Sequence, residues 1–325
     1  MTGAPGLSRA VGDIDRPART IFLGSGAFAV PILDAVLATP EVEVVAVVSA
    51  PDRPVGRRRA MTPAPVAARA RELGLPLLQP ERVRAPESVT ALAAIRPELG
   101  VLADYGQIIP ASILDLPAHG ILNVHPSLLP RHRGAVPIPS TILAGDHEAG
   151  VTLIRMDAGL DTGPIVAVDR WPLDGHETAP ELERRAAEAG AALLRATIAA
   201  WLRGEIAATP QATHGVTLTR PLRREDGLLD PRHPARDLER RVRAYDPWPG
   251  AYLETPAGRL IVRRARTETG GVAAEPGRIG PGPDLRLATS DGWLVLDEVQ
   301  PAGGRPMSGP EYLRGRPSLA DSRIA

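Results

Sequence analysis

Apolar runs and amphipathic segments alternate along the first two thirds of the chain. The apolar runs are rich in β-branched and aliphatic residues, which is typical of strands buried on both faces of a sheet. They lie at Thr20–Gly24, Val42–Ser49, Leu75–Leu78, Leu99–Ala103, Gly120–His125, Val151–Met156 and Ile165–Val168. Helical patterns separate them at Val30–Leu37, Pro65–Leu73, Ser88–Ile95, Ile138–Leu143 and Thr178–Leu202. This alternation predicts an α/β fold whose parallel-rich sheet carries helices on both faces.

The pattern changes after Trp201. Residues 206–217 are rich in small, polar and Pro residues and are predicted to form a linker. Beyond them, short strand-like runs alternate with Gly- and Pro-rich turns, which is typical of a small β-barrel or sandwich. The runs lie at Ala251–Leu253, Leu260–Val262, Leu285–Ala288 and Trp293–Val299, with one predicted helix at Asp237–Arg243. We therefore predict a tail over residues 1–19, a domain over 20–205, the linker, and a second domain over 218–325.

Composition narrows the class of protein. The 325 residues carry 38 basic and 38 acidic side chains, and every basic one is Arg, which suits phosphate recognition better than Lys. Cysteine is absent, which excludes disulfides and thiolate metal sites. No apolar run is long enough to span a bilayer, and residues 1–19 lack the apolar segment of a secretory signal. We expect a cytoplasmic monomer with no membrane partner.

The most informative polar residues are Asn123 and His125, at the end of a predicted strand. Because they stand two apart, their side chains point to the same face, and Pro126 keeps the residue before it extended. In parallel sheets, ligands lie at the carboxyl ends of the strands. Together with the distant Asp161, the pair supplies an oxyanion donor, a proton acceptor and an orienting carboxylate, a set suited to acyl transfer. On local sequence alone, Asn123 and His125 could equally cap a strand end.

The glycine-rich turn Gly24-Ser25-Gly26-Ala27-Phe28-Ala29 has two interpretations. It fits the dinucleotide-binding pattern of glycines after a first strand. The acid expected at the end of the second strand is misplaced, because Ser49 and Ala50 stand there and Asp52 is already in the next loop. The alternative is that the glycines only permit a tight strand-to-helix turn.

A basic segment, Pro51 to Arg59, follows the second strand. Two prolines and a glycine predict an irregular loop, and four arginines cluster within it: Arg53, Arg57, Arg58 and Arg59. An ordinary solvated loop is one interpretation. The other is that the arginines reach a phosphate backbone or clamp a small anionic substrate near the carboxyl ends of the strands.

Motifs from about residue 20 to residue 316 make the chain resemble the methionyl-tRNA formyltransferase family of folate-dependent formyltransferases. The motifs before the basic segment and within it are Gly24 to Pro31 and Pro51-Asp52-Arg53-Pro54 with Gly56-Arg57. Those that follow are Leu78-Gln79-Pro80, Ala103 to Pro110, Asn123 to Pro130 with Arg131 to Ala135, Gly150 to Thr152, and Met156-Asp157 with Gly159 to Gly163. Late in the chain come Arg243 to Pro249 and Leu296 to Met307.

The resemblance implies a Rossmann-like formyltransferase domain and a C-terminal OB-like domain that binds tRNA. It implies transfer of a formyl group from 10-formyltetrahydrofolate, the donor substrate, to the α-amino group of methionine on initiator tRNA. In such enzymes the positions of Asn123, His125 and Asp161 are catalytic.

The resemblance also implies two binding regions. Positions matching Ser127, Leu128, Leu129 and Pro130 line the folate site, and the loop matching Gly56-Arg57 engages the acceptor stem, so Arg53, Gly56, Arg57, Arg58 and Arg59 are the predicted tRNA contacts. The chain departs from the family pattern at Gly26, Arg58-Arg59, His132 and Pro139-Ser140. None of these departures touches the three catalytic positions, but the last puts local tRNA or folate contacts in doubt.

The predicted mechanism is attack of the acceptor amine on the formyl carbon. Asn123 and His125 would stabilise the resulting oxyanion, while Asp161 would hold the tautomer of His125 and help to move the amine proton. The chain has no HExxH or paired-His signature, so we expect no metal. Three alternatives remain: a formyltransferase acting on a small amine such as an amino sugar nucleotide, a hydrolase that releases formate from the same donor, and a non-catalytic RNA- or nucleotide-binding module.

Overall fold

The computed structural model describes residues 16–55, 60–268, 275–319 and 322–324. They form two compact units. The first unit contains Met1–Arg133, Gly150–Arg170 and Arg184–Thr217, and the second contains Gly134–Ala149, Trp171–Glu183 and Leu218–Ala325. The segment 206–217 thus belongs to the first unit, and the linear domain boundaries stay a prediction.

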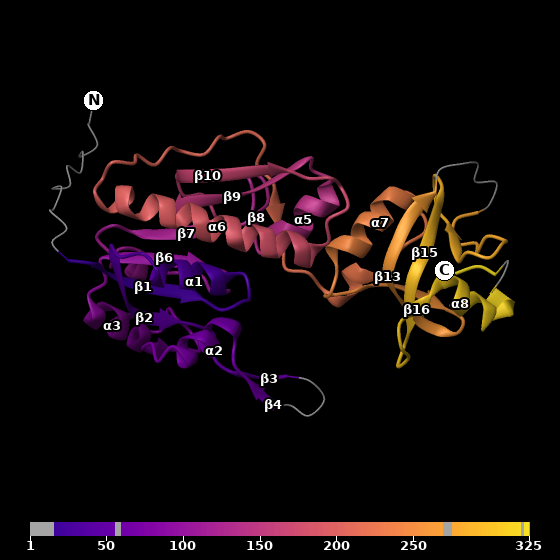
Figure 1. The fold of residues 1–325 in the computed structure, drawn as a ribbon, viewed down its shortest axis with the longest axis horizontal. Helices are drawn as coiled ribbons and strands as arrows, with labels where there is room; N and C mark the ends of the chain where they lie inside the picture. Colours follow the sequence, from indigo (N-terminus) through magenta and orange to yellow (C-terminus); the bar gives the residue numbers. More distant parts are fainter. Residues whose placement is uncertain (1–15, 56–59, 269–274, 320–321, 325) are drawn as a thin grey trace. The chain divides into compact units, whose positions relative to one another are not determined.

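A seven-stranded sheet forms the centre of the α/β part (Figure 1). Its order is β10-β9-β7-β6-β1-β2-β5. The strands are β1 (Ala18–Gly24), β2 (Val42–Val48), β5 (Leu77–Leu78), β6 (Leu99–Ala103), β7 (Ile121–His125), β9 (Glu148–Arg155) and β10 (Ile165–Pro172). The pairings from β5 through β7 are parallel, and β9 pairs antiparallel with β7. The parallel-rich α/β fold is therefore confirmed.

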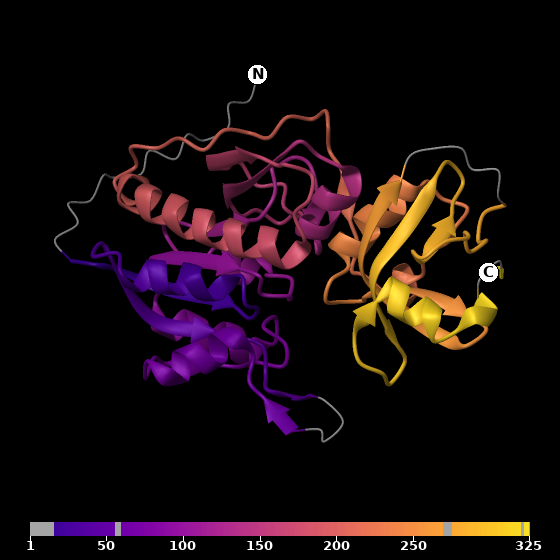
Figure 2. The ribbon, with the colours of Figure 1, turned by 45° about the vertical axis from the view of Figure 1, so that its right-hand side comes forward.

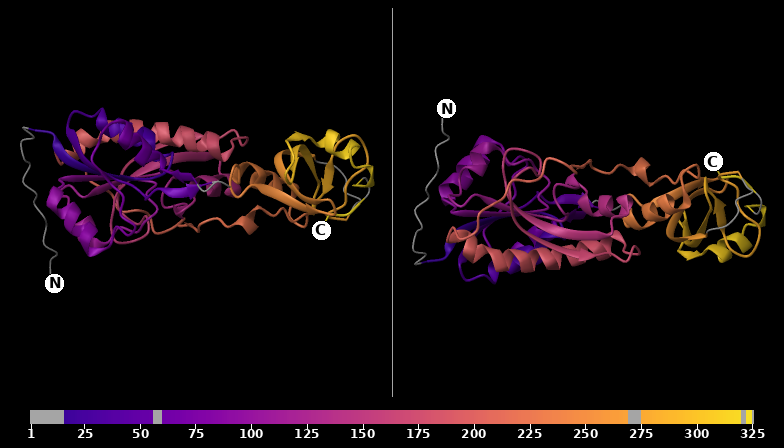
Figure 3. Two further views of the ribbon diagram at one scale, coloured as in Figure 1. Left: turned by 90° about the horizontal axis from the view of Figure 1, so that it is seen from below. Right: turned by 90° about the horizontal axis from the view of Figure 1, so that it is seen from above.

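Helices cover both faces of this sheet, as the two views of Figure 3 show. They are α1 (Ala29–Leu37), α2 (Pro65–Glu72), α3 (Pro86–Ile95), α4 (Ala111–Leu114) and α6 (Ala179–Leu202), whereas α5 (Pro137–Ala144) belongs to the second unit. Because side chains alternate along a strand, Ile21 and Leu23 of β1 pack on one face with Leu92 of α3. On the other face, a Cβ on Gly190 of α6 would lie 2.7 Å from Cγ1 of Val124, so glycine allows α6 to lie close to β7.

Where the structure describes it, the basic segment after β2 contains a short strand that its prolines do not predict. This strand, β3 (Arg53–Val55), pairs antiparallel with β4 (Ala60–Thr62) as a two-stranded ribbon, with Pro54 opposite Met61. A ribbon of two edge strands tolerates the missing N–H group of proline, which explains the error. Four of the predicted tRNA contacts, Gly56, Arg57, Arg58 and Arg59, lie outside the described residues.

A small antiparallel sheet forms the core of the second unit, in the order β12-β13-β15-β14 with β16 on β15. Its elements are β12 (Ala251–Thr255), β13 (Gly258–Glu268), β14 (Arg286–Ala288), β15 (Trp293–Pro301), β16 (Met307–Ser308), α7 (Ala235–Ala244) and α8 (Gly309–Arg314). Register shifts between Val262 and Ala265 bend β13, and the sheet curls around an aliphatic core (Figure 2). This confirms the small OB-like domain.

The predicted linker is held against the first unit by backbone hydrogen bonds. Thr209 and Ile165 of β10 exchange two of them, at 2.7 and 2.8 Å. Further on, the carbonyl of Thr217 accepts from the N–H of Arg133 at 3.0 Å, and its hydroxyl accepts from the N–H of His132 at 2.7 Å. The coil after α6 in Figure 1 is therefore part of the surface around the site described next.

Candidate active site

Strand β7 carries Asn123 and His125 at its carboxyl end. In the register with β9, Asn123 lies opposite Ile154 and His125 lies opposite Thr152. Both side chains are buried, with Asn123 6% and His125 5% exposed. The strand ends at His125, as the proline after it predicts.

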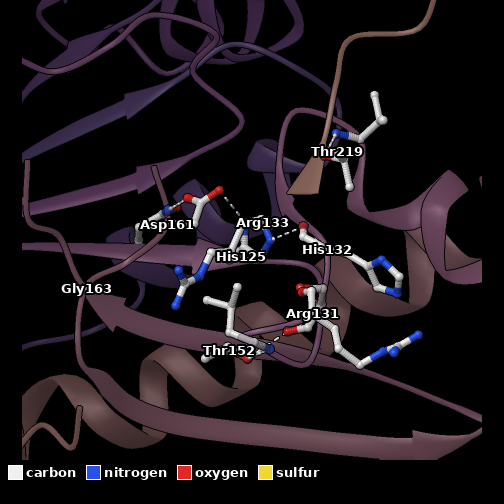
Figure 4. A network of polar contacts seen from close by, with 12 residues as sticks. His125, Arg131, His132, Arg133, Thr152, Asp161, Gly163 and Thr219 are labelled. Carbon is white, nitrogen blue, oxygen red and sulfur yellow. Dashed lines mark hydrogen bonds and ion pairs between the residues drawn. The ribbon is translucent and has the colours of Figure 1, made fainter. Parts of the chain in front are cut away.

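Asp161 comes from the loop after β9 and lies beside His125 (Figure 4). The Asn123 amide Nδ2 donates a hydrogen bond to Oδ1 of Asp161 at 3.3 Å. The other carboxylate oxygen, Oδ2, lies 3.7 Å from Nδ1 of His125. The structure thus brings the three predicted catalytic side chains together. Their roles in catalysis stay predictions.

The backbone carbonyl of His132 sets the tautomer of His125. Nε2 of His125 lies 3.1 Å from this oxygen, and a carbonyl only accepts, so Nε2 carries the hydrogen. Burial lowers the pKa of His125 below its usual value, and the Asp161 carboxylate offsets part of that effect. The ring is therefore neutral at pH 7, with Nδ1 unprotonated and facing Asp161. This differs from the predicted mechanism, in which Asp161 itself fixes the tautomer.

The Asp161 loop has a fixed and strained backbone. Asp161 has a φ of 51°, a left-handed conformation that Asp and Asn tolerate better than most residues. Within the loop, Oδ1 of Asp157 accepts from the Thr162 hydroxyl at 2.6 Å and from the Gly159 N–H at 3.0 Å. At Gly163 a Cβ would lie 2.0 Å from the carbonyl oxygen of Arg155, so only glycine fits there.

The turn directly after β7 contains the predicted folate residues. Ser127 and Leu129 are buried, whereas Leu128 and Pro130 are partly exposed. The Ser127 hydroxyl donates to the carbonyl of Arg131 at 2.7 Å, so it shapes the turn. Nothing in the structure tests contact between these residues and a folate.

Thr152 of β9 supports the same turn, which its sequence context does not predict. Its hydroxyl donates to the Ser127 carbonyl at 2.7 Å and accepts from the Leu129 N–H at 3.2 Å. Thr152 itself is fully buried. One hydroxyl thus satisfies two buried backbone groups that helix and sheet hydrogen bonds do not reach.

The glycine-rich turn after β1 packs closely against β6. A Cβ on Gly24 would lie 2.9 Å from the carbonyl oxygen of Ala103, and one on Gly26 would lie 1.6 Å from Oδ2 of Asp104. The N–H groups of Ser25 and Gly26 donate to the carbonyl of Asp104 at 2.9 and 3.3 Å. Because these N–H groups and this space are already used, the geometry favours the packing interpretation over dinucleotide binding.

Arg53 is the one predicted tRNA contact among the described residues. It lies in β3, and its guanidinium pairs with Glu81 at 3.0 Å. Both side chains are more than half exposed, so the pair contributes little and leaves Arg53 able to meet another anion.

A surface cavity of about 540 Å³ lies beside the Asp161 loop. Its walls come from that loop, from Arg133 and from the segment around Gln211: Asp157, Thr162, Pro164, Pro210, Ala212, Thr213 and Val216. Within the described residues, no group of three or more His, Cys, Asp or Glu side chains is arranged to hold a metal ion. No helix in that part of the chain is both long and apolar enough to cross a membrane.

Two parts of the chain match known protein families. Residues 18–198 match the formyl transferase family model, and residues 221–317 match the model for the formyl transferase C-terminal domain. The methionyl-tRNA formyltransferase of Halorhodospira halophila is 46% identical over 306 residues, which is 92% of this chain and 96% of that protein. That of Chloroflexus aggregans is 44% identical over 301 residues, covering 91% and 97%.

A solved structure shares the fold at lower identity. The N-formyltransferase from Helicobacter canadensis, in complex with folinic acid and dTDP-3-aminofucose, aligns with a TM-score of 0.63 at 15% identity. The alignment covers 86% of this chain and 98% of that protein.

Proposed function

This chain belongs to the methionyl-tRNA formyltransferase family, and we propose that it transfers a formyl group from 10-formyltetrahydrofolate to methionine on initiator tRNA. The acceptor is the α-amino group, and the product, N-formylmethionyl-tRNA, begins translation. The observation that carries the proposal is the convergence of Asn123, His125 and Asp161 at the carboxyl end of β7.

The reaction balances without an oxidant, a reductant or a third substrate. The acceptor nitrogen bonds to the formyl carbon, and the bond from that carbon to N10 of the folate breaks. The amine loses one proton and N10 gains one. The folate is therefore a substrate used once per turnover, and the protein must hold the two reactants and move that proton.

His125 is the proposed proton acceptor. Its hydrogen-bonded Nε2 is committed to the His132 carbonyl, whereas Nδ1 carries a free lone pair. A proton taken from the attacking amine at Nδ1 would face the Asp161 carboxylate at 3.7 Å, which stabilises the imidazolium that forms. The same proton can then pass to N10 as the folate leaves.

Asn123 is the proposed donor to the oxyanion. One N–H of its amide goes to Asp161, and the second is available to the oxygen of the formyl group as negative charge develops there. An amide already fixed in a buried site needs no reorganisation when the charge appears, which is why such donors contribute strongly to rate.

Binding of the two substrates is proposed for different parts of the chain. The partly exposed apolar side chains of Leu128 and Pro130, next to His125, suit the flat ring system of a folate, and Ser127 and Leu129 support them. For the tRNA we propose the β3–β4 ribbon with Arg53 and the arginines that follow it, together with the C-terminal domain. Phosphate contacts of this kind make the KM for tRNA rise steeply with salt.

In the test, the purified protein is given 10-formyltetrahydrofolate that is labelled in the formyl group. Three reactions are compared: one with Met-charged initiator tRNA, one with a dTDP-amino sugar, and one with no acceptor. We expect the label on the methionyl-tRNA alone. Label on the amino sugar would favour the small-amine alternative, and labelled formate without an acceptor would favour the hydrolase. Unreacted donor with every acceptor would contradict an enzymatic role.

We also propose that the protein acts as a monomer in the cytoplasm, where its tRNA substrate is charged. Light scattering after size exclusion should give a mass near the 34.4 kDa of one chain. A mass of twice that value would contradict the monomer.

A further inference from the structure

Gln211 forms hydrogen bonds with the backbone of the Asp161 loop. It lies in the segment between the two formyl transferase matches. Its amide Nε2 donates to the carbonyl of Asp161 at 2.8 Å and to the carbonyl of Gly163 at 2.7 Å. Its Oε1 accepts from Nε and Nη2 of Arg133 at 3.1 and 2.7 Å. Both amide hydrogens and both acceptor sites of the side chain are therefore used.

These contacts connect the two sides of the catalytic cluster. Arg133 directly follows His132, whose carbonyl fixes the ring of His125. Gln211 thus joins the segment that orients the imidazole to the loop that supplies the carboxylate. The backbone of the same segment is itself anchored at Thr209 and Thr217, so Gln211 projects from a fixed support.

The position of the Asp161 carboxylate depends on the loop backbone that carries it. Its contact with His125, at 3.7 Å, is too long for a hydrogen bond, and the one from Asn123 is long at 3.3 Å. The φ of 51° at Asp161 is a conformation that persists only when the surroundings impose it. Two hydrogen bonds from one amide to the carbonyls of Asp161 and Gly163 impose it from outside the loop.

We propose that Gln211 is a positioning residue for formyl transfer, which holds the Asp161 carboxylate against His125 by fixing the backbone of the loop. This inference rests on the proposed function. Gln211 lies outside both family matches, because the first ends at residue 198 and the second begins at residue 221. The inference therefore adds to the site a residue that neither match contains.

The first test is Gln211→Glu. Glutamate still accepts from Arg133 but has no hydrogen to give the two carbonyls, so it separates support of the loop from anchoring of the segment. Misplacing a catalytic group by about 1 Å costs about 10²-fold in rate, so we expect kcat to fall by about that factor. The KM values for tRNA and folate should stay within about twofold, because no substrate contact is removed. His214→Ala, an exposed residue in the same segment, is the control and should keep full kcat.

The second test is Gln211→Met, which has similar length and no charge. It removes every hydrogen bond of the side chain, and we expect the same loss of kcat. In this variant the imidazole of His125, followed by NMR, should titrate at lower pH than in the wild type, because the carboxylate no longer stays beside it.

Full kcat in both variants, with folded protein by circular dichroism, would overturn the positioning role. An unchanged His125 titration in Gln211→Met would overturn it too, and this readout needs no turnover. Failure of the proposed function would look different, because the wild-type protein itself would leave methionyl-tRNA unformylated.

Discussion

Replacing Asp161 by Asn removes one charge from the site and changes little else. Asn has the shape of Asp and tolerates the left-handed backbone at φ 51° equally well. The backbone carbonyl still accepts from Gln211, and the side-chain oxygen still accepts from Asn123. The substitution therefore isolates the effect of the carboxylate charge on His125.

The size of that effect follows from the distance. Unit charges 3.7 Å apart interact by about 1 kcal/mol in water and by about 4 kcal/mol at the effective dielectric constant of a protein. An attraction of this kind favours the protonated ring and therefore raises the pKa of the imidazole. Burial already lowers this pKa and Asp161 raises it, so the variant should have a pKa lower still.

The assay is an NMR titration of ¹³C-labelled histidine, with the His125 signal assigned from a His125→Asn sample. The pKa of His125 should fall in Asp161→Asn, and kcat should fall because the imidazolium loses its counter-charge. The control Asp169→Asn removes an exposed carboxylate on β10 and should leave both unchanged. A pKa that stays constant or rises in Asp161→Asn would refute the assigned electrostatics.

The same shift has a consequence for stability. The folded pKa of His125 is below its unfolded value of about 6.5, so the unfolded state binds more protons between the two values. The contribution of neutral His125 to the free energy of unfolding is fully present above about pH 6.5. It is lost as the pH falls toward the pKa of His125 in the folded state. In Asp161→Asn this window extends to lower pH. When urea unfolding is followed as the pH is lowered from neutral, the loss should therefore continue to lower pH in the variant than in the wild type, and losses that level off at the same pH would contradict the reasoning.

Three further predictions concern other parts of the chain. Asn123→Asp should lower kcat by about 10²–10³-fold with the fold kept, because the oxyanion loses its donor; full kcat in steady-state assays would exclude the role. Thr152→Val should lower the free energy of unfolding by about 1–3 kcal/mol in urea titrations, because two buried backbone groups lose their partner, whereas Thr152→Ser should lose much less. Arg57→Ala should raise the KM for tRNA far more than that for folate and flatten its salt dependence, and an unchanged KM for tRNA would remove this residue from the interface.

The strands and helices of the α/β part follow from the sequence because burial on both faces leaves a continuous apolar run that few other arrangements produce. The direction of β9 is not encoded in this way. A strand buried on both faces has the same apolar sequence pattern whether it is parallel or antiparallel to its neighbours. The antiparallel pairing of β9 with β7 could therefore not be predicted. The ribbon of β3 and β4 was missed for another reason, since β4 is exposed and buries no apolar face.

Some residues of the candidate site could be predicted from the sequence, and others could not. Asn123 and His125 could be paired from the sequence because two residues of one strand share a face. Asp161 was a chemically suitable partner whose catalytic role only the family motif implied, since sequence spacing does not show which loop folds back onto β7. Gln211 left no signal, and Thr152 appeared only within a family motif that gave it no role, because a single Gln in a linker and a single Thr in a strand acquire their roles only through contacts made by the folded chain.

The central claim is that Asn123, His125 and Asp161 surround one reactive carbon. The most direct measurement is a crystal structure of the protein with a stable formyl-bearing folate such as folinic acid. We expect the formyl oxygen within hydrogen-bond distance of the Asn123 amide, and the formyl carbon beside Nδ1 of His125. A folate that binds with its formyl group outside the reach of both side chains would contradict it.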